Sequence, residues 1–244
     1  APYCYLLGDL PFALVPFGCS FLVLGLSSWG MGKKEILRLM AGFRKFREKY
    51  FANEHPLYQR LSSSAGQAPK TLIIGCSDSR VDPAIITSAS PGELFIVRNV
   101  ANLVPPFEKG GVHGVSAAIE FAVVNLKVEN VIVLGHRQCG GIRALMTNNQ
   151  ETHSDSFVDN WVSVAKSAKL RVLEKYGHES EENLCRHGEL ESIITSLQNL
   201  RTFPFVEQAI KERDLALMGI YFDLEQGQLL EYDEKIDAFK NIEV

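Results

Sequence analysis

The chain has 244 residues, 46% of them hydrophobic, and a formal net charge of −4 at pH 7. This hydrophobic content can fill a well-packed core, and the near-balanced charge argues against the basic face that a nucleic-acid partner needs. The five cysteines are odd in number and widely spaced, which argues against a disulfide scaffold. They indicate a reducing compartment or a metal site, and we expect a cytoplasmic protein.

Residues 1–31 differ in character from the rest of the chain. No charged residue occurs from Leu10 to Gly32, but Pro11, Pro16 and Gly18 interrupt the apolar run, and the basic region of a secretory signal is missing. The Met-Gly-Lys-Lys sequence that begins at Met31 is typical of an ordinary cytosolic start. We interpret 1–31 as an atypical hydrophobic extension. The alternatives are a packing arm and a membrane or targeting role, and only an anchor would bring the chain to a membrane.

The remaining chain alternates between predicted strands and helices. Apolar residues at three- and four-residue steps predict a helix over 35–50, and helical stretches follow over 112–126 and 158–176. Short apolar runs predict strands at 71–75, 94–97, 131–134 and 215–222, and a turn at 226–227 leads into an antiparallel edge strand at 228–232. The order predicts one α/β domain over 32–244, with a mostly parallel central sheet flanked by helices and an N-terminal helical arm.

Two of the predicted strands end in residues that can bind a metal. Cys76 follows the first strand, and an H-x-x-C pair, His136 and Cys139, follows the third. Parallel strands present their carboxyl ends at one sheet edge, so the three side chains can converge there. Thiolate and imidazole are the ligands that zinc favours, and three protein ligands leave a fourth position open, as in catalytic sites. We predict one Zn²⁺ per chain at these residues.

Asp78 and Arg80 follow Cys76 on the same predicted loop. Two residues apart, they can form a bidentate ion pair, although a solvated surface pair of little energetic consequence is the alternative. A carboxylate this close to a zinc thiolate can bind the metal or accept a hydrogen bond from metal-bound water. Arg80 would decide between these roles by holding the carboxylate away from the metal.

The Cys-Ser-Asp-Ser-Arg sequence at 76–80 and the His-x-x-Cys-Gly-Gly sequence at 136–141 together resemble the β-class carbonic anhydrases, and the similarity extends from about 34 to 232. The resemblance implies the β-carbonic anhydrase fold and the reversible hydration of carbon dioxide to bicarbonate and a proton. It also implies zinc ligands at Cys76, His136 and Cys139. In the implied mechanism zinc hydroxide attacks the substrate, and Asp78 and Arg80 act as a catalytic dyad that orients the hydroxide.

The substrate pocket implied by the plant-like branch of this family contains five residues of this chain. Gln67 and the backbone amide of Gly140 would donate hydrogen bonds to substrate oxygens, and Phe95 and Val100 would supply apolar walls. Phe121 stands where the family commonly has tyrosine, which removes one hydroxyl from the pocket.

The resemblance also bears on regulation and assembly. Another branch of the family carries an inhibitory bicarbonate site built on a tryptophan three residues before the first cysteine. That position is Ile73 here, although Arg98 can supply the arginine of that site. We therefore expect an open zinc site with water as the fourth ligand. The family forms dimers that often pair further, so a homodimer or a higher homo-oligomer such as a tetramer is implied.

Three other functions share some of these residues. A carbon disulfide or carbonyl sulfide hydrolase of the same fold would use the same ligands with different access to the pocket. A zinc-stabilised bicarbonate sensor would have no use for Asp78, Arg80 and Gln67. A cysteine phosphatase would use Cys76 as nucleophile and Arg80 to bind phosphate, but this hypothesis leaves His136 and Cys139 unexplained.

Overall fold

The computed structural model describes residues 31–51, 56–62, 66–148 and 155–243, which fall into two compact units divided between Arg60 and Leu61. Apart from Met31, the segment interpreted as a hydrophobic extension lies outside the described residues. The assignment of 32–244 to one domain remains a prediction.

The N-terminal unit contains α1 (Met31–Phe51) and most of α2 (Pro56–Leu61). Helix α1 confirms the helix predicted over 35–50. The rings of Phe46 and Tyr58 meet edge to face with their centroids 5.4 Å apart. Other apolar side chains of α1, among them Met40 and Phe43, are exposed over more than half of their surface.

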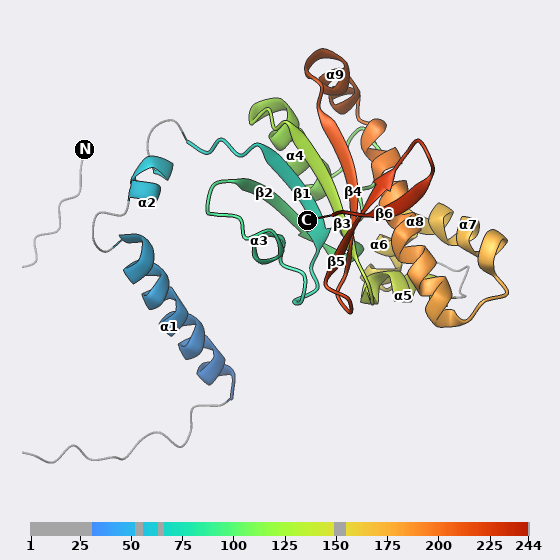
Figure 1. Ribbon diagram of the computed structural model, residues 1–244, viewed down its shortest axis with the longest axis horizontal. Coiled ribbons are helices and arrows are strands. Elements are labelled where there is room, and N and C mark those ends of the chain that lie inside the picture. The colour runs from blue at the N-terminus through green and yellow to red at the C-terminus, as the bar shows by residue number, and fades with distance from the viewer. Residues whose placement is uncertain (1–30, 52–55, 63–65, 149–154, 244) are drawn as a thin grey trace, which may run out of the picture. The chain divides into compact units, whose positions relative to one another are not determined.

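The second unit is built on a six-stranded sheet in the order β2-β1-β3-β4-β5-β6 (Figure 1). The first four strands are parallel, as predicted, and the last two are antiparallel. Their bounds are β1 Thr71–Cys76, β2 Leu94–Asn99, β3 Asn130–His136, β4 Ala216–Asp223, β5 Gln228–Asp233 and β6 Ala238–Asn241. The strand expected at the edge, β5, instead has β6 beside it. Strand β6 is four residues long with Phe239 as its one large apolar residue, so its sequence pattern is weak.

The helices differ more from the sequence prediction than the strands do. Predicted helix 112–126 begins at Gly114 and passes into a π-helical turn. Predicted helix 158–176 is interrupted by a 3₁₀ turn. The observed helices are α3 Pro83–Ile86, α4 Gly114–Glu120, α5 Gly140–Thr147, α6 Phe157–Val162, α7 Lys166–Tyr176, α8 Glu181–Arg201 and α9 Pro204–Arg213, and the short turns are η1 Val100–Asn102, η2 Phe121–Asn125 and η3 Ser163–Ala165.

Helix α8 was not predicted, although it is 21 residues long. Its buried face combines apolar side chains with small and polar ones, including Gly188, Ser192 and Ser196. A regular apolar period is therefore absent from its sequence, and periodicity is the main signal for an amphipathic helix.

Helix α8 packs directly on β3 and β4 because glycines on these strands leave room for one of its side chains (Figure 1). A Cβ atom on Gly135 would lie 2.6 Å from the Ile193 side chain, and one on Gly219 would lie 2.7 Å from it. Ile193 is fully buried in the core cluster that also contains Ile74 and Val133. The two glycines therefore set how closely the helix approaches the sheet.

This packing predicts that Gly219→Ala destabilises the protein. The new methyl group would lie 2.7 Å from Ile193 Cγ2 and 2.9 Å from Leu197 Cδ1, and overpacking of this kind costs about 1–3 kcal/mol. Urea denaturation measures the loss. Gly114→Ala is the control because nothing lies within 4 Å of its added methyl group. Equal stability of the two variants would contradict the close approach of α8.

Candidate metal centre

Two cysteines and a histidine converge at the carboxyl edge of the parallel strands. Strands β1 and β3 pair in parallel, with Gly75 opposite Leu134, so Cys76 and His136 lie at the same edge of the sheet. Cys139 lies just before α5, three residues beyond His136. The ligand atoms of the three side chains all lie within 4.8 Å of one another, and all three residues are buried.

The geometry of this group fits a Zn²⁺ ion. The two sulfur atoms are 3.9 Å apart, close to the ~3.8 Å that a tetrahedral zinc with two thiolates at about 2.3 Å requires. Nδ1 of His136 lies 2.8 Å from the carbonyl oxygen of Arg137, and since a carbonyl can only accept, Nδ1 carries the hydrogen. Nε2 is buried without a well-formed hydrogen bond among the described residues and faces Cys76. Its lone pair is thus left for a metal.

The Cys76 and Cys139 sulfurs share a hydrogen bond. This bond, together with the neighbouring His136, lowers the pKa of Cys76 despite its burial. The Cys76 thiolate and burial raise the pKa of Cys139. Binding of a metal to both sulfurs therefore displaces a proton from Cys139, which makes metal affinity dependent on pH.

Asp78 and Arg80 form a bidentate ion pair beside this group. Asp78 Oδ1 accepts from Nε of Arg80 at 3.0 Å, and Oδ2 accepts from Nη2 at 2.8 Å. The Arg80 hydrogen bonds hold the pKa of the Asp78 carboxyl well below its usual range. Nη2 of Arg80 also donates to the carbonyl oxygen of Gln138 at 3.2 Å. Arg80 therefore connects the loop after β1 to the turn that carries Cys139.

Arg98 also binds the loop after β1. Its guanidinium donates to the carbonyl oxygens of Cys76 at 2.8 Å and Asp78 at 2.6 Å, and to the carboxylate of Asp82 at 2.9 Å. From the sequence, Arg98 was expected only as part of an inhibitory site. Its role in this loop depends on the register of β2 against β1, which places Asn99 beside Cys76.

The turn between β3 and α5 is constrained by close contacts. Gln138 has a positive φ of 58°, a conformation that glycine adopts more readily. A Cβ on Gly141 would lie 2.6 Å from Val100 Cγ1 and 2.9 Å from Ala101 Cβ. A side chain at position 141 would thus push α5 and the Cys139 turn away from η1.

Residues 71–229 match the sequence profile of the family described as carbonic anhydrase. The chain is 38% identical over 202 residues to a carbonic anhydrase of Synechocystis sp., a match that spans 83% of this chain and 73% of that protein. The chain belongs to the β-carbonic anhydrase family.

Solved structures agree with this assignment. The β-carbonic anhydrase CcaA matches with a TM-score of 0.80 and 36% identity, over 86% of this chain and 93% of that chain. The β-carbonic anhydrase CafA of Aspergillus fumigatus matches with a TM-score of 0.72 and 29% identity, over 82% and 91% of the two chains. A tetrameric β-carbonic anhydrase of Sordaria macrospora matches with a TM-score of 0.65 and 29% identity, over 82% and 94%.

The predicted family, fold and enzyme class are therefore confirmed: the chain is an enzyme with carbonic anhydrase activity. The ligand set and the roles of individual residues remain predictions. Within the described residues, no helix is long and apolar enough to span a membrane.

The residues predicted to bind substrate do not all lie beside the metal group of this β-carbonic anhydrase. Val100 lies close, packed against Gly141. The rings of Phe95 and Phe121 contact each other at 5.8 Å, but Phe95 pairs with Leu72, four residues before Cys76, which is about 13 Å along a strand. Gln67 is exposed and precedes β1, at the end of the strand opposite to Cys76.

The Gly140 amide, also predicted to bind substrate, begins α5 directly after Cys139. Gly140 is exposed, and nothing lies within 4 Å of where its Cβ would stand. The space beside this amide is therefore open on the side that a side chain would occupy.

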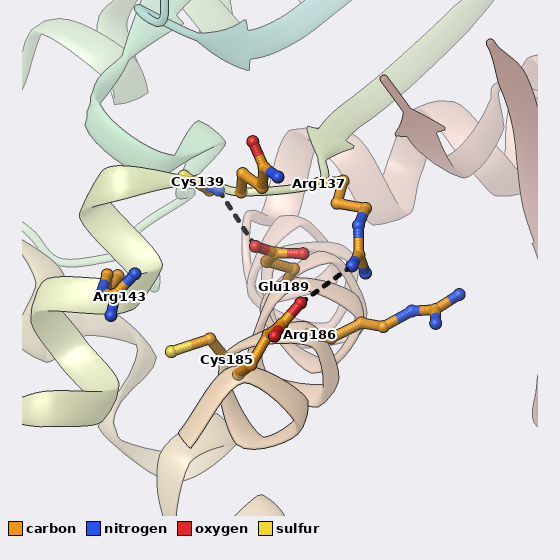
Figure 2. A pocket seen from close by; sticks show the side chains of 8 residues that line it. Arg137, Cys139, Arg143, Cys185, Arg186 and Glu189 are labelled. Atoms are coloured by element: carbon orange, nitrogen blue, oxygen red, sulfur yellow. Dashed lines mark hydrogen bonds and ion pairs between the residues drawn. The ribbon is translucent and has the colours of Figure 1, made fainter. Parts of the chain in front are cut away.

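A cavity of about 320 Å³ opens on the α8 side of the Cys139 turn (Figure 2). It was not predicted from the sequence, because half of its lining residues come from α8. The lining residues are Arg137, Gln138, Cys139, Arg143, Glu182, Cys185, Arg186 and Glu189.

The three-residue group predicts which cysteines hold zinc. Cys76→Ser or Cys139→Ser should lose bound zinc, because only two strong ligands remain. Cys185→Ser is the matched control, since Cys185 is also a buried free thiol but lies outside the group. Metal analysis after dialysis measures zinc per chain. Retention of one zinc by Cys76→Ser would show that the ligand assignment is wrong.

Proposed function

We propose that this enzyme hydrates carbon dioxide to bicarbonate and a proton at one Zn²⁺ held by Cys76, His136 and Cys139, with Asp78 and Arg80 as the catalytic dyad. The observation that carries the proposal is the buried group of two sulfurs and one imidazole with the Asp78–Arg80 ion pair beside it. A structural zinc site would have four protein ligands, whereas three leave a position for the reaction.

When bound, zinc would supply a nucleophile at neutral pH by lowering the pKa of a bound water to about 7 in the best-known case. The Asp78 carboxylate would accept the hydrogen of this nucleophile and so direct its lone pair at the substrate. Both carboxylate oxygens are held by Arg80, so Asp78 is kept from becoming a fourth ligand. The Gly140 amide donates to the substrate oxygen on which charge develops.

Arg80 is better suited to this role than to phosphate binding. Its guanidinium already contacts both oxygens of Asp78 and the backbone of Gln138. A cysteine phosphatase would need this side chain free to bind the phosphate, and a paired carboxylate would repel the substrate.

We infer that the enzyme acts as a homodimer or tetramer. Gln67, Phe95 and Phe121 lie at the far end of β1 from Cys76, so a second copy is needed to bring such residues to the metal. Ile96, Val100, Phe121 and Val124 are each exposed by 37–45% and offer an apolar surface for it. The similar β-carbonic anhydrases from Sordaria macrospora are tetrameric. We also infer a reducing compartment such as the cytoplasm, because the zinc ligands include two free thiols.

Stopped-flow measurement of carbon dioxide hydration tests the proposed function. Asp78→Asn should lower kcat/KM by on the order of 10²-fold, the usual effect of losing one positioned hydrogen-bonding group at a reacting centre, while zinc content stays at one per chain. Asp233→Asn is the control, because it removes the same charge from a distant ion pair with Lys240. Unchanged hydration by Asp78→Asn would refute the dyad. Zinc without hydration in the wild type would refute the proposed reaction, and carbon disulfide would then be the next substrate.

The carbon dioxide hydration activity should rise between pH 6.5 and 9. Two thiolates would donate more charge to zinc than neutral imidazoles do, so a water held there would lose its proton at a higher pH. Asp78 does not produce this rise, because Arg80 holds the pKa of its carboxyl far below that range and the group stays ionised throughout. Activity measured in a series of matched buffers checks the profile. A profile that falls across this range would contradict the proposal.

A further inference from the structure

We propose that Glu189 is a positioning residue of the metal centre, which holds the backbone of Cys139 and so aims its thiolate at the metal. The inference rests on the zinc site of the proposed function, and it concerns a residue outside the ligands and the dyad.

Glu189 connects three elements of the fold. It lies on α8 and is only 4% exposed. Its Oε1 accepts from the backbone N–H of Cys139 at 3.0 Å, and its Oε2 accepts from the hydroxyl of Tyr221, on β4, at 2.8 Å. Figure 2 shows the carboxylate reaching from α8 to the turn that carries Cys139. Both oxygens are therefore fixed by buried donors.

The Cys139 N–H has a particular need for this acceptor. Cys139 is buried and stands at the N-cap position of α5, where its backbone N–H has no acceptor within the helix. A buried N–H without an acceptor is costly. The preceding Gln138 has a left-handed backbone conformation, which persists only when its surroundings hold it. The Glu189 carboxylate supplies such a restraint at the residue that carries the thiolate.

The choice of residue at this position also indicates a specific role. Burying a carboxylate is unfavourable, and burial raises the pKa of Glu189. An apolar side chain would fill the space without this cost, as Ile193 and Leu197 do farther along the same helix. The carboxylate provides two acceptor oxygens at a fixed separation, one for Cys139 and one for Tyr221.

The packing of α8 explains how Glu189 reaches the turn. Ile193 packs against Gly135, the residue immediately before His136. Glu189 precedes Ile193 by four residues and so lies one turn away on the same face of the helix. The packing of Ile193 against Gly135 therefore also brings Glu189 close to the proposed ligands.

Zinc affinity and metal geometry in two variants of Glu189 test this role. Glu189→Leu removes the acceptor while filling the space, so water from the neighbouring cavity is less able to replace it. Glu189→Gln is the matched variant, because its amide oxygen can accept from Cys139 and its NH₂ can donate to the Tyr221 oxygen. Competition with a chelator measures zinc affinity, and the absorption bands of the Co²⁺-substituted protein report thiolate geometry.

We expect Glu189→Leu to lose about 10–100-fold in zinc affinity, the usual effect of removing a group that orients a metal ligand, and to shift the Co²⁺ bands. Glu189→Gln should stay close to the wild type in both measurements. A purely structural role would lower the unfolding midpoint of metal-free Glu189→Leu while leaving affinity and spectrum unchanged, and that result would overturn the inference. Equal losses in the Leu and Gln variants would also overturn it.

If Glu189→Leu does not fold, Tyr221→Phe decides the question. It removes one anchor of the carboxylate without changing Cys139, and we expect a smaller loss of zinc affinity with a band shift in the same direction. Unchanged affinity and bands in Tyr221→Phe would then reject the inference. A wild-type protein that binds no zinc would instead refute the proposed function, so the two failures are distinguishable.

Discussion

The parallel pairing of β1 with β3 is the constraint on which the site depends. It brings the ends of two strands that are far apart in sequence to one edge, with Gly75 opposite Leu134. Cys76 and His136 thereby become neighbours, and Cys139 joins them through a turn of two residues. A slip of one residue in this register would move the Cys76 side chain to the other face of the sheet. The arrangement of the three metal-binding side chains therefore depends on the hydrogen-bond register of the sheet as well as on the residue types.

Two arginines and one helix maintain the loops that leave this edge. Arg98 holds the carbonyl oxygens of Cys76 and Asp78, and Arg80 links Asp78 to the backbone of Gln138. Helix α8 approaches the sheet closely because Ile193 packs over glycines, and the same helix presents Glu189 to Cys139. Backbone groups of the ligand-bearing loops are therefore bound from several directions, which favours a preorganised site.

This arrangement suggests which parts of the proposed active site each subunit of an oligomer would supply. The proposed ligands and dyad come from one chain, whereas Phe95 lies farther along β2, where its ring contacts Phe121 of η2. In the proposed oligomer, one subunit would supply the metal ligands and the dyad, and its partner would supply part of the substrate pocket. Assembly and catalysis would then be coupled, because a separated subunit would keep its metal group but lack part of the pocket wall.

The sequence by itself determined the four parallel strands, the family, and the residues proposed as ligands and dyad. These depend on short apolar runs and on two compact motifs, at 76–80 and 136–141, that stay local in the chain. Only the tertiary structure decided that α8 forms over Glu181–Arg201, because small residues on its buried face interrupt the apolar pattern that would predict a helix. The tertiary structure also added β6, which has too few apolar residues to be recognised alone. It alone placed Glu189 at Cys139, since a contact across 50 residues depends on packing and leaves no local pattern.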